Sequence, residues 1–283
     1  MKIKTRIFLF LLFLYLSYPA QSFSFERIIS LQPSITEILF ALDQGKKIVG
    51  NTEYCRFPEA AKKIEKIGGY STPNLEKILS LRPDLVMMTT DDSPPKVEAA
   101  IRRAGIDTLV VRATTVQEIY TEIEIISKKL AIEDKGKALV AQMKEKVETS
   151  LTEIEPLKNQ KVLMIVQRRP LIAVGPRSFL GDLLALAKTK NITEGSLLPY
   201  PHIGMETVIA KKPDMIFDLD LSSEDPFWER LTSLPAVQNG RVYHLSPDLF
   251  IPGPRITEAL SVLVEKIRAD GKANERQKSN EGN

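Results

Sequence analysis

Residues that form disulfides and metal sites are scarce in this sequence. Its 283 residues include one cysteine, Cys55, two histidines, His202 and His244, and one tryptophan. A lone cysteine cannot make an intramolecular disulfide, so the fold must depend on its apolar core. Cys55 itself is typical of a packed, inert residue. Two histidines so far apart argue against a histidine-rich zinc or manganese site, and we expect no metal site and no resident cofactor.

The chain also lacks the short motifs that mark common enzyme classes. It contains no G-x-S-x-G turn, no G-x-x-x-x-G-K-[ST] loop, no G-x-G-x-x-G turn and no H-E-x-x-H pair. We therefore expect a protein that is not an enzyme. A secreted α/β hydrolase is the alternative from another functional class, and the missing nucleophile motif argues against it.

The amino terminus has the pattern of an export signal. Three cations within the first six residues precede an apolar run of about 12 residues, Ile7 to Tyr18, and a small-x-small motif, Ala20 to Ser22. The run is shorter than the roughly 20 residues that a membrane-spanning helix needs. We expect residues 1–22 to be a signal peptide cleaved near Ser22, with an uncleaved anchor as the alternative. No cysteine stands at the cleavage point to take a lipid.

The charge of the chain is nearly balanced. The formal net charge is +3, and removal of the three cations of the leader leaves 36 Lys and Arg against 36 Asp and Glu. A chain without a basic excess gives no electrostatic reason to expect nucleic acid as a partner.

One stretch of sequence occurs twice. Residues 74–86 and 204–216 each hold a short helical segment with a glutamate in its first turn, a Pro-Asp pair, and an apolar run suited to a buried strand. The prolines of the two pairs, Pro83 and Pro213, stand 130 residues apart. Proline ends a helix because it lacks an N–H and disfavours helical geometry in the residue before it. A repeat of this period is too long for a solenoid and favours two similar lobes.

Elsewhere helical patterns alternate with continuously apolar segments such as residues 27–31 and 161–166. Strands of this kind indicate a parallel sheet covered on both faces. One helical pattern runs from Asp134 to Glu155 and stops at Pro156. At 1.5 Å per residue it is roughly 33 Å long, enough to join two lobes as a stiff rod. A long surface helix of a single domain is the alternative.

We therefore predict two Rossmann-like α/β lobes joined by a single long α-helix, with a ligand cleft between the lobes. The predicted division is a signal peptide at 1–22, an N-terminal lobe at 26–131, a linking helix at 132–157, a C-terminal lobe at 160–268 and a disordered tail at 271–283.

Local signals predict where several helices begin. Capping residues are expected at Ser34, with Glu37 as the partner in a capping box, at Thr115 and at Ser178. Further helices are expected after Pro58 and around residues 227–231, where Trp228 should lie in the core.

The loops at the carboxyl ends of the predicted strands hold the candidate site, because ligands lodge at this edge of open α/β sheets. The candidate ligand-binding residues are Pro33, Tyr54, Arg56 and Tyr70 in the first half and Arg168 and Tyr200 in the second. Tyrosine offers a flat apolar face with a hydroxyl at its rim, which suits a large, flat, partly polar ligand. Tyrosines that merely cover the core are the alternative.

The glutamates of the repeat, Glu76 and Glu206, also allow two interpretations. A glutamate in the first turn of a helix stabilises it through the helix dipole by about 0.3 to 1 kcal/mol, without any further role. Their matched placement alternatively offers one carboxylate per lobe to two basic sockets on a two-fold symmetric partner.

Three motifs carry a family resemblance: Arg27-Ile28-Ile29-Ser30-Leu31-x-Pro33-Ser34-x-Thr36-Glu37, Asn74-Leu75-Glu76-x-Ile78-x-x-Leu81-x-Pro83-Asp84-Leu85-Val86, and Leu234-Pro235-Ala236-Val237-x-x-Gly240-Arg241-Val242-Tyr243. They resemble the periplasmic substrate-binding proteins of ABC importers for vitamin B12, ferric siderophores and haem. The resemblance covers about residues 26–268 and is strongest with the cobalamin-binding members.

The resemblance implies a periplasmic protein, expected as a monomer, that holds cobalamin in a cleft between two lobes with little hinge motion. The family's docking glutamates, which meet arginines of a two-fold symmetric permease, match Glu76 and Glu206. Aromatic residues that line the cobalamin cleft match Tyr54, Tyr70 and Tyr200.

Haem or a ferric siderophore is the alternative ligand within the same family. An anionic ligand would be favoured by arginines that point into the cleft, for which the candidates are Arg56, Arg168, Arg169 and Arg177. Iron ligands would come from Tyr54, Tyr70, Tyr200 or His202.

Overall fold

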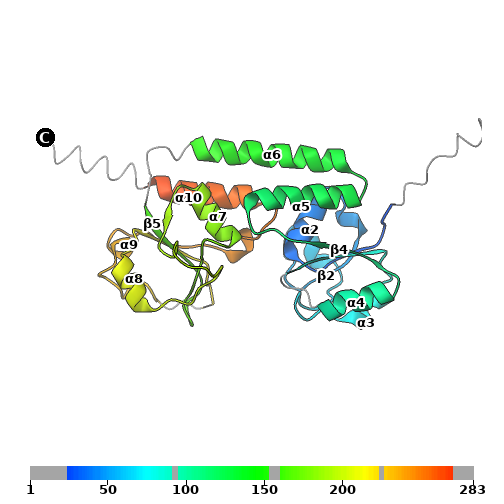
Figure 1. Ribbon diagram of the computed structural model, residues 1–283, viewed down its shortest axis with the longest axis horizontal. Coiled ribbons are helices and arrows are strands. Elements are labelled where there is room, and N and C mark those ends of the chain that lie inside the picture. The colour runs from blue at the N-terminus through cyan, green and yellow to red at the C-terminus, as the bar shows by residue number, and fades with distance from the viewer. Residues whose placement is uncertain (1–23, 91–94, 153–159, 223–225, 270–283) are drawn as a thin grey trace, which may run out of the picture.

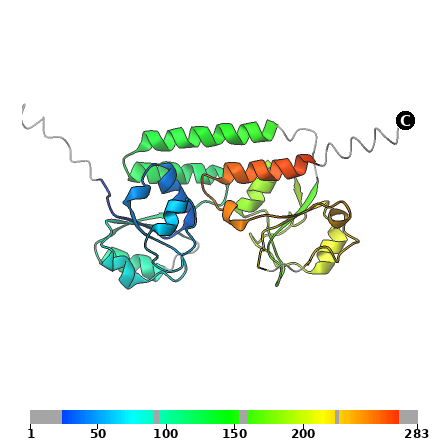
Figure 2. The same cartoon turned by 180° about the vertical axis from the view of Figure 1, so that it is seen from behind.

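The computed structural model describes residues 24–90, 95–152, 160–222 and 226–269. Two α/β lobes lie beneath three long helices, α5 (Val116–Lys129), α6 (Glu133–Thr152) and α10 (Ile256–Ala269). Figures 1 and 2 show α6 running along both lobes, with α5 beneath it on the N-terminal lobe and α10 on the C-terminal lobe. The predicted fold class, two α/β lobes joined by a long helix, is confirmed; the predicted lobe boundaries stay a prediction.

Both lobes have a parallel sheet with the same strand order. The N-terminal sheet runs β2-β1-β3-β4, and the C-terminal sheet runs β7-β5-β8-β9, with β6 added antiparallel to β5. The strands are β1 (Ile28–Ser30), β2 (Ile48–Asn51), β3 (Leu85–Thr89), β4 (Asp107–Val111), β5 (Lys161–Gln167), β6 (Ile172–Ala173), β7 (Lys190–Asn191), β8 (Met215–Asp218) and β9 (Val242–His244). The shared order agrees with the repeat found in the sequence.

The two copies of the repeat end their helices in the same way. Helix α3 (Leu75–Ser80) leads to β3, and α8 (Met205–Lys211) leads to β8. The residue before each proline is left-handed, with φ of 47° at Arg82 and 50° at Lys212. A proline disfavours the right-handed helical region in the preceding residue, so the chain leaves the helix at that point.

The aspartate of each Pro-Asp pair fastens the repeat to its lobe. The Asp84 carboxylate accepts hydrogen bonds from the backbone N–H groups of Glu26, at 2.7 Å, and Arg27, at 3.1 Å. The Asp214 carboxylate accepts one from the N–H of Lys161 at 2.8 Å. In both lobes the N–H of the aspartate donates back to the same entering segment, at Arg27 and Lys161. The Pro-Asp pair therefore joins the repeat to the first strand of its sheet, a role that the sequence did not indicate.

The remaining helical segments are α2 (Pro33–Ala41), α4 (Pro95–Arg103), α7 (Phe179–Leu186), α9 (Pro235–Gln238) and the 3₁₀ turns at Gly45–Lys47, Glu59–Lys63 and Pro247–Leu249. The predicted caps of α5 and α7 are confirmed, because Thr115 and Ser178 accept hydrogen bonds from Glu118 N–H and Gly181 N–H. The predicted capping box is wrong: α2 starts at Pro33, which places Ser34 inside the helix.

Two further local predictions need correction. The segment after Pro58 forms a 3₁₀ turn instead of an α-helix, and residues 227–230 form turns instead of the predicted helix. Trp228 is nevertheless fully buried, as predicted, and its Nε1 donates to Asp218 at 2.6 Å. The hydrogen bond to a buried carboxylate holds this segment in place without a helix.

A single apolar cluster connects the lobes through the long helices. It includes Ile28 and Met87 from the N-terminal sheet, Val140 and Met143 from α6, and Met164 from the C-terminal sheet. Each lobe also has one smaller apolar cluster of its own. The lobes are therefore held together by buried apolar contact as well as by the chain. Among the described residues, no helix is both long and apolar enough to cross a membrane.

Glu122 on α5 gives a prediction about stability. Its side chain is 2% exposed, its Oε1 has no hydrogen-bond partner among the described residues, and burial raises the pKa of Glu122 to about 8. The folded protein therefore holds Glu122 protonated at pH values where the unfolded chain ionises it. We expect this contribution to stability to be complete below about pH 4.5 and to decline by at most about 1.4 kcal/mol per pH unit up to about pH 8.

The measurement is urea unfolding of the wild-type protein and of Glu122→Gln at pH 5 and pH 8. The variant cannot titrate at this position, so its stability should fall less between the two pH values. An identical fall in both proteins would contradict the prediction.

Candidate ligand-binding cleft and docking residues

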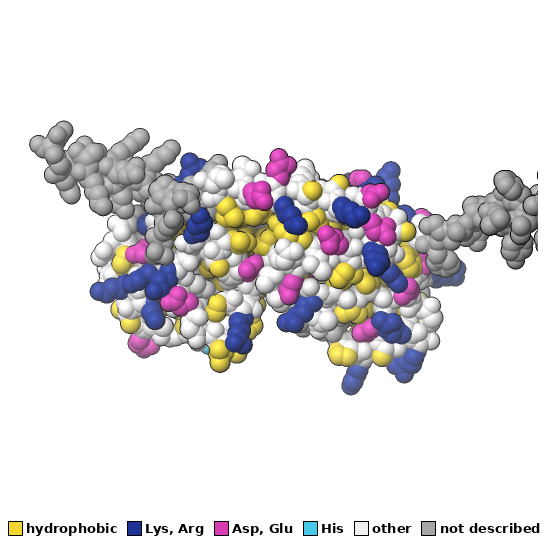
Figure 3. Space-filling view, turned by 45° about the horizontal axis from the view of Figure 1, so that its top comes forward, with side chains coloured by type: hydrophobic (Ala, Val, Ile, Leu, Met, Phe, Trp, Pro, Cys, Tyr) yellow, Lys and Arg dark blue, Asp and Glu magenta, His cyan; other side chains and the backbone are white. Residues whose placement is uncertain are grey.

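The loops that face each other between the lobes follow the carboxyl ends of the parallel strands. On the N-terminal lobe these are the start of α2 after β1 and the loop 52–58 after β2. On the C-terminal lobe they are the segment after β5 and the segment after β9, which includes the turn Pro247–Leu249. The space-filling view shows a notch between the lobes on the side away from α6 (Figure 3).

Two candidate tyrosines of the N-terminal lobe lie side by side. The rings of Tyr54, which is exposed, and Tyr70, which is half-buried, have centroids 5.0 Å apart and are tilted by 52°. This is the range of favourable aromatic pairing. Pro33 lies half-buried at the first position of α2. The structure thus brings Tyr54 and Tyr70 together, although 16 residues separate them in the sequence.

Buried polar contacts hold the loop that carries Tyr54. Cys55 is buried beneath it, with its Sγ 3.2 Å from the hydroxyls of both Thr36 and Thr52. The Nζ of Lys66 donates to Asn51 Oδ1 at 2.7 Å and to the carbonyl of Cys55 at 3.3 Å. Cys55 is therefore the packed residue that the sequence predicted. Its contacts and those of Lys66 hold the loop in place.

Tyr200, the third candidate tyrosine, lies on the C-terminal lobe. It lines a cavity of about 280 Å³ together with Val166, Phe179, Leu180, Leu219, Pro247 and Phe250. The segment before it lies close against the chain after β6, where Gly175 N–H donates to Pro199 O at 2.8 Å. A Cβ on Gly175 would come within 2.1 Å of the carbonyl oxygen of Leu198, so only glycine permits this approach.

Arg168 lines a neighbouring cavity of about 350 Å³ whose wall also includes Arg169, Asp220 and Phe227. Its side chain is 7% exposed, and its Nε donates to the buried Asp218 at 2.8 Å. One terminal nitrogen lies 3.2 Å from Nδ1 of His244. The guanidinium charge is therefore already matched by a carboxylate within the lobe.

Asp220 adds a second carboxylate to this cavity. Burial opposes ionisation of Asp220, but hydrogen bonds from Ser222 and from the N–H of Arg168 outweigh burial and lower its pKa. The N–H of Arg168 lies 2.7 Å from Asp220 Oδ2. With Asp218 and Asp220 beside Arg168, this part of the wall carries no excess of positive charge from that arginine.

Ion pairs also link one lobe to the other. The exposed Arg56 lies 3.6 Å from Asp248. The buried Glu37 on α2 accepts two hydrogen bonds from Arg255, at 2.6 and 2.9 Å. Burial raises the pKa of Glu37, and the hydrogen bonds from Arg255 offset only part of that shift, so Glu37 depends on Arg255 to stay charged.

Arg255 also touches both loops that face the cleft. A terminal nitrogen of its side chain donates to the carbonyl of Asp248 at 2.6 Å, and its guanidinium lies 4.0 Å from the centroid of the Phe57 ring. Asp248 is followed by Phe250 of the Tyr200 cavity, and Phe57 closes the loop of Tyr54. One arginine thus connects the two walls. No local pattern in the sequence marks Arg255, because its partner Glu37 lies 218 residues away.

The matched glutamates, Glu76 and Glu206, lie on helices at the side of the lobes away from α6. Glu76 is in the first turn of α3 and Glu206 in the first turn of α8, and both are exposed. Figures 1 and 2 show α3 and α8 on separate lobes, on the side of the molecule away from α6. Neighbouring Lys77 is paired with Glu65. Each lobe therefore carries one exposed carboxylate on a helix at the side away from α6.

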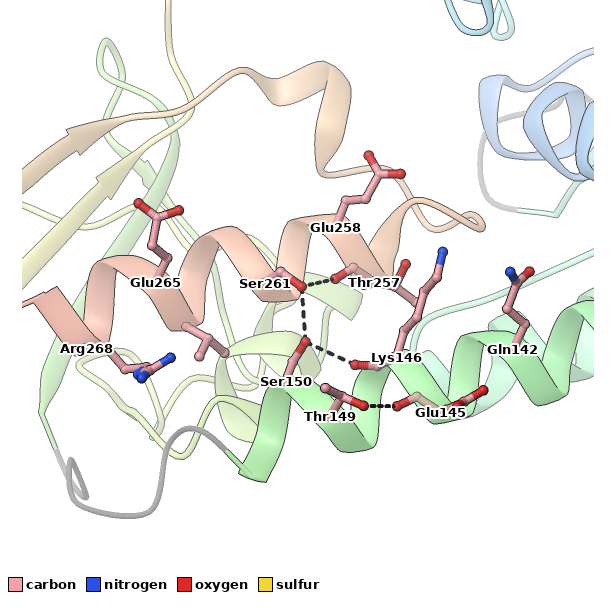
Figure 4. Close-up of a pocket in the computed structure, with 11 residues that line it drawn as sticks. Gln142, Glu145, Lys146, Thr149, Ser150, Thr257, Glu258, Ser261, Glu265 and Arg268 are labelled. Atoms are coloured by element: carbon pink, nitrogen blue, oxygen red, sulfur yellow. Dashed lines mark hydrogen bonds between the residues drawn. The ribbon is translucent and has the colours of Figure 1, made fainter.

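A cavity of about 830 Å³ lies elsewhere, between α6 and α10 (Figure 4). The hydroxyls of Ser150 and Ser261 meet across it at 3.0 Å. None of the predicted ligand-binding residues lines this cavity. Within the described residues, no group of three or more His, Cys, Asp or Glu side chains is placed to hold a metal ion.

Two similar lobes that face each other through loops and share a helical spine define a two-lobed binding protein. A model of the periplasmic binding protein family matches residues 28–249, and the chain belongs to that family. The resemblance noted in the sequence is thereby confirmed. Membership implies a location outside the cytoplasm.

The proteins similar to this chain include binding proteins for vitamin B12 and for heme. The chain is 31% identical to a vitamin B12-binding protein of Vibrio cholerae over 252 residues, which cover 88% of this chain and 91% of the relative. The crystal structure of the periplasmic vitamin B12 binding protein of Vibrio cholerae matches with a TM-score of 0.78 at 28% identity, over 88% of this chain and 98% of that one. A periplasmic heme-binding protein from Roseiflexus matches with a TM-score of 0.79 at 27% identity, over 86% and 97%.

Proposed function

We propose that this protein captures cobalamin in the periplasm and delivers it to an ABC importer, without covalent chemistry and as a monomer. Residues 1–22, which lie outside the described part of the chain, serve as the export signal and are cleaved near Ser22. Tyr54, Tyr70, Tyr200, Pro33, Arg56 and Arg168 contribute to the ligand cleft. Glu76 and Glu206 dock on a two-fold symmetric permease.

The pairing of two candidate arginines with carboxylates is the observation that carries the choice of cobalamin. Arg168 is matched by Asp218, and Arg56 lies beside Asp248. Haem carries two carboxylates, which need cations that are not already paired. The edge of the corrin ring carries neutral amides, which hydrogen-bond to arginines and aspartates alike. Relatives named as vitamin B12-binding proteins support the same ligand.

Haem or a ferric siderophore is the second candidate. A heme-binding protein has the same fold at 27% identity, and the paired Tyr54 and Tyr70 offer phenol oxygens to iron. The two candidates differ in what they require from these side chains: a corrinoid needs the flat rings, whereas iron needs the hydroxyls.

The experiment is an absorbance and calorimetric titration of the mature protein with cyanocobalamin, haem and a ferric siderophore. We expect saturable 1:1 binding of cyanocobalamin. Tight binding of haem without a response to cyanocobalamin would overturn the proposal.

The tyrosines supply a sharper test. Tyr54→Ala and Tyr200→Ala should each weaken cyanocobalamin binding about tenfold or more, because buried aromatic contacts dominate such interfaces. Tyr54→Phe and Tyr200→Phe keep the rings and should bind within a few-fold of the wild type. If the Phe variants lose as much affinity as the Ala variants, the hydroxyls are required and iron ligation becomes the better account.

A further inference from the structure

Leu79 and Ile209 are large apolar side chains left exposed at equivalent positions of the two lobes. They are 37% and 42% exposed. They stand 130 residues apart, the spacing of the repeat, and each follows the glutamate of its helix by three positions. A single exposed apolar residue needs no explanation. A pair at matching positions of two similar lobes does, because each lobe then exposes a large apolar residue at the same place beside its glutamate.

Neither side chain is needed to pack its own helix. The residue before each of them, Ile78 on α3 and Val208 on α8, is fully buried and faces the core. Leu79 and Ile209 lie on the outward side, where residues three positions apart in a helix are neighbours. Each glutamate therefore shares an exposed helix face with a large apolar side chain.

A third position of this face is also matched. Ser80 and Ala210 follow the apolar residues, stand four positions after the glutamates, and are exposed. Both are small, so a partner can approach the helix backbone closely beside them. The exposed face of α3 and that of α8 thus repeat one pattern: a carboxylate, a large apolar side chain and a small residue.

We propose that Leu79 and Ile209 are apolar anchors that dock together with Glu76 and Glu206 on the permease. The partner is a two-fold symmetric membrane protein whose two equivalent sockets each combine a cationic group with an apolar wall. The carboxylates select the cationic group by charge, and the leucine and isoleucine exclude water from the contact. This inference rests on the proposed docking function.

The test measures binding of the full mature protein to its permease–ATPase complex in lipid nanodiscs. Leu79→Ser with Ile209→Ser should weaken the complex at least about tenfold and leave cyanocobalamin affinity unchanged. Ile125→Ser is the matched control: Ile125 is 43% exposed on α5, away from both docking helices. The control should bind like the wild type.

Salt dependence separates the two kinds of contact. Screening weakens ionic contacts and leaves apolar ones nearly unaffected. The serine double variant should keep the salt dependence of the wild type, whereas Glu76→Gln with Glu206→Gln should remove it. If the serine variant binds within twofold of the wild type while the glutamate variant fails, the anchors are refuted and docking stands. If neither variant weakens the complex, docking through this face is refuted altogether.

Discussion

Replacing Glu76 and Glu206 together by arginine should abolish transport of the ligand while leaving its affinity for the protein nearly unchanged. Both carboxylates are exposed on the outer side of the lobes, and neither lines a cavity that holds a predicted ligand-binding residue. The change reverses the charge that each lobe offers to its socket, and like charges in contact are costly across an interface. Cellular uptake of labelled cobalamin and calorimetry on the purified variant provide the two measurements.

The control for this variant is Glu124→Arg with Glu145→Arg. These glutamates are also exposed, but they lie on α5 and α6 at the opposite side of the molecule. The control changes the net charge by the same amount, so it should retain uptake. Normal uptake by the Glu76 and Glu206 double variant would disprove docking through this pair. Lost uptake in both variants would mean that net charge matters instead of position.

Removal of Arg255 should cause the largest loss of stability of any single change at the cleft. Arg255→Ala leaves the carboxylate of Glu37 buried without its partner, which typically costs about 3 to 5 kcal/mol. The substitution also removes the hydrogen bond to the carbonyl of Asp248 and the cation–π contact with the ring of Phe57. Because these contacts hold the two walls of the cleft, ligand affinity should fall together with the free energy of unfolding. Urea unfolding and cyanocobalamin titration are the measurements.

Two comparisons make this prediction specific. Arg102→Ala breaks an exposed ion pair with Glu98 on α4 and should cost at most about 0.5 kcal/mol. Glu37→Gln combined with Arg255→Ala removes the unpaired charge and should recover part of the stability lost in Arg255→Ala. Ligand affinity should stay low in the double variant, since the links to Asp248 and Phe57 remain broken. Full recovery of affinity would show that Arg255 does not position the walls.

The features that could be predicted from the sequence are those set by nearby residues. The helix ends before Pro83 and Pro213 and the caps at Thr115 and Ser178 depend on a few neighbours, and the structure agrees with each. The repeat, read at a fixed spacing, predicted two similar lobes, and the structure adds that their sheets share one strand order. The continuously apolar segments and the one long helical pattern were enough to predict the fold class.

The features that could not be predicted depend on residues far apart in the chain. Glu37 has the spacing of a capping box with Ser34, yet its carboxylate is taken by Arg255 across the interface between the lobes. Arg168 was placed correctly in a loop after a strand, but its pairing with Asp218 requires the register of β5 against β8. Trp228 belongs to the core without a helix because Asp218 accepts its N–H. Sequence patterns identify which loops reach the cleft, and long-range pairing decides which side chains remain available in it.

The apolar cluster that runs through α5, α6 and α10 also limits how this protein can be altered. A lobe cut out at the ends of its sheet would carry an uncovered apolar face where the spine had been, and such a fragment would tend to aggregate. Chimeras between relatives that exchange whole lobes therefore need to bring the spine helices with them. Grafting the short loops around Tyr54 and Tyr200 leaves that shared interior untouched, which makes them the practical units for transferring ligand preference.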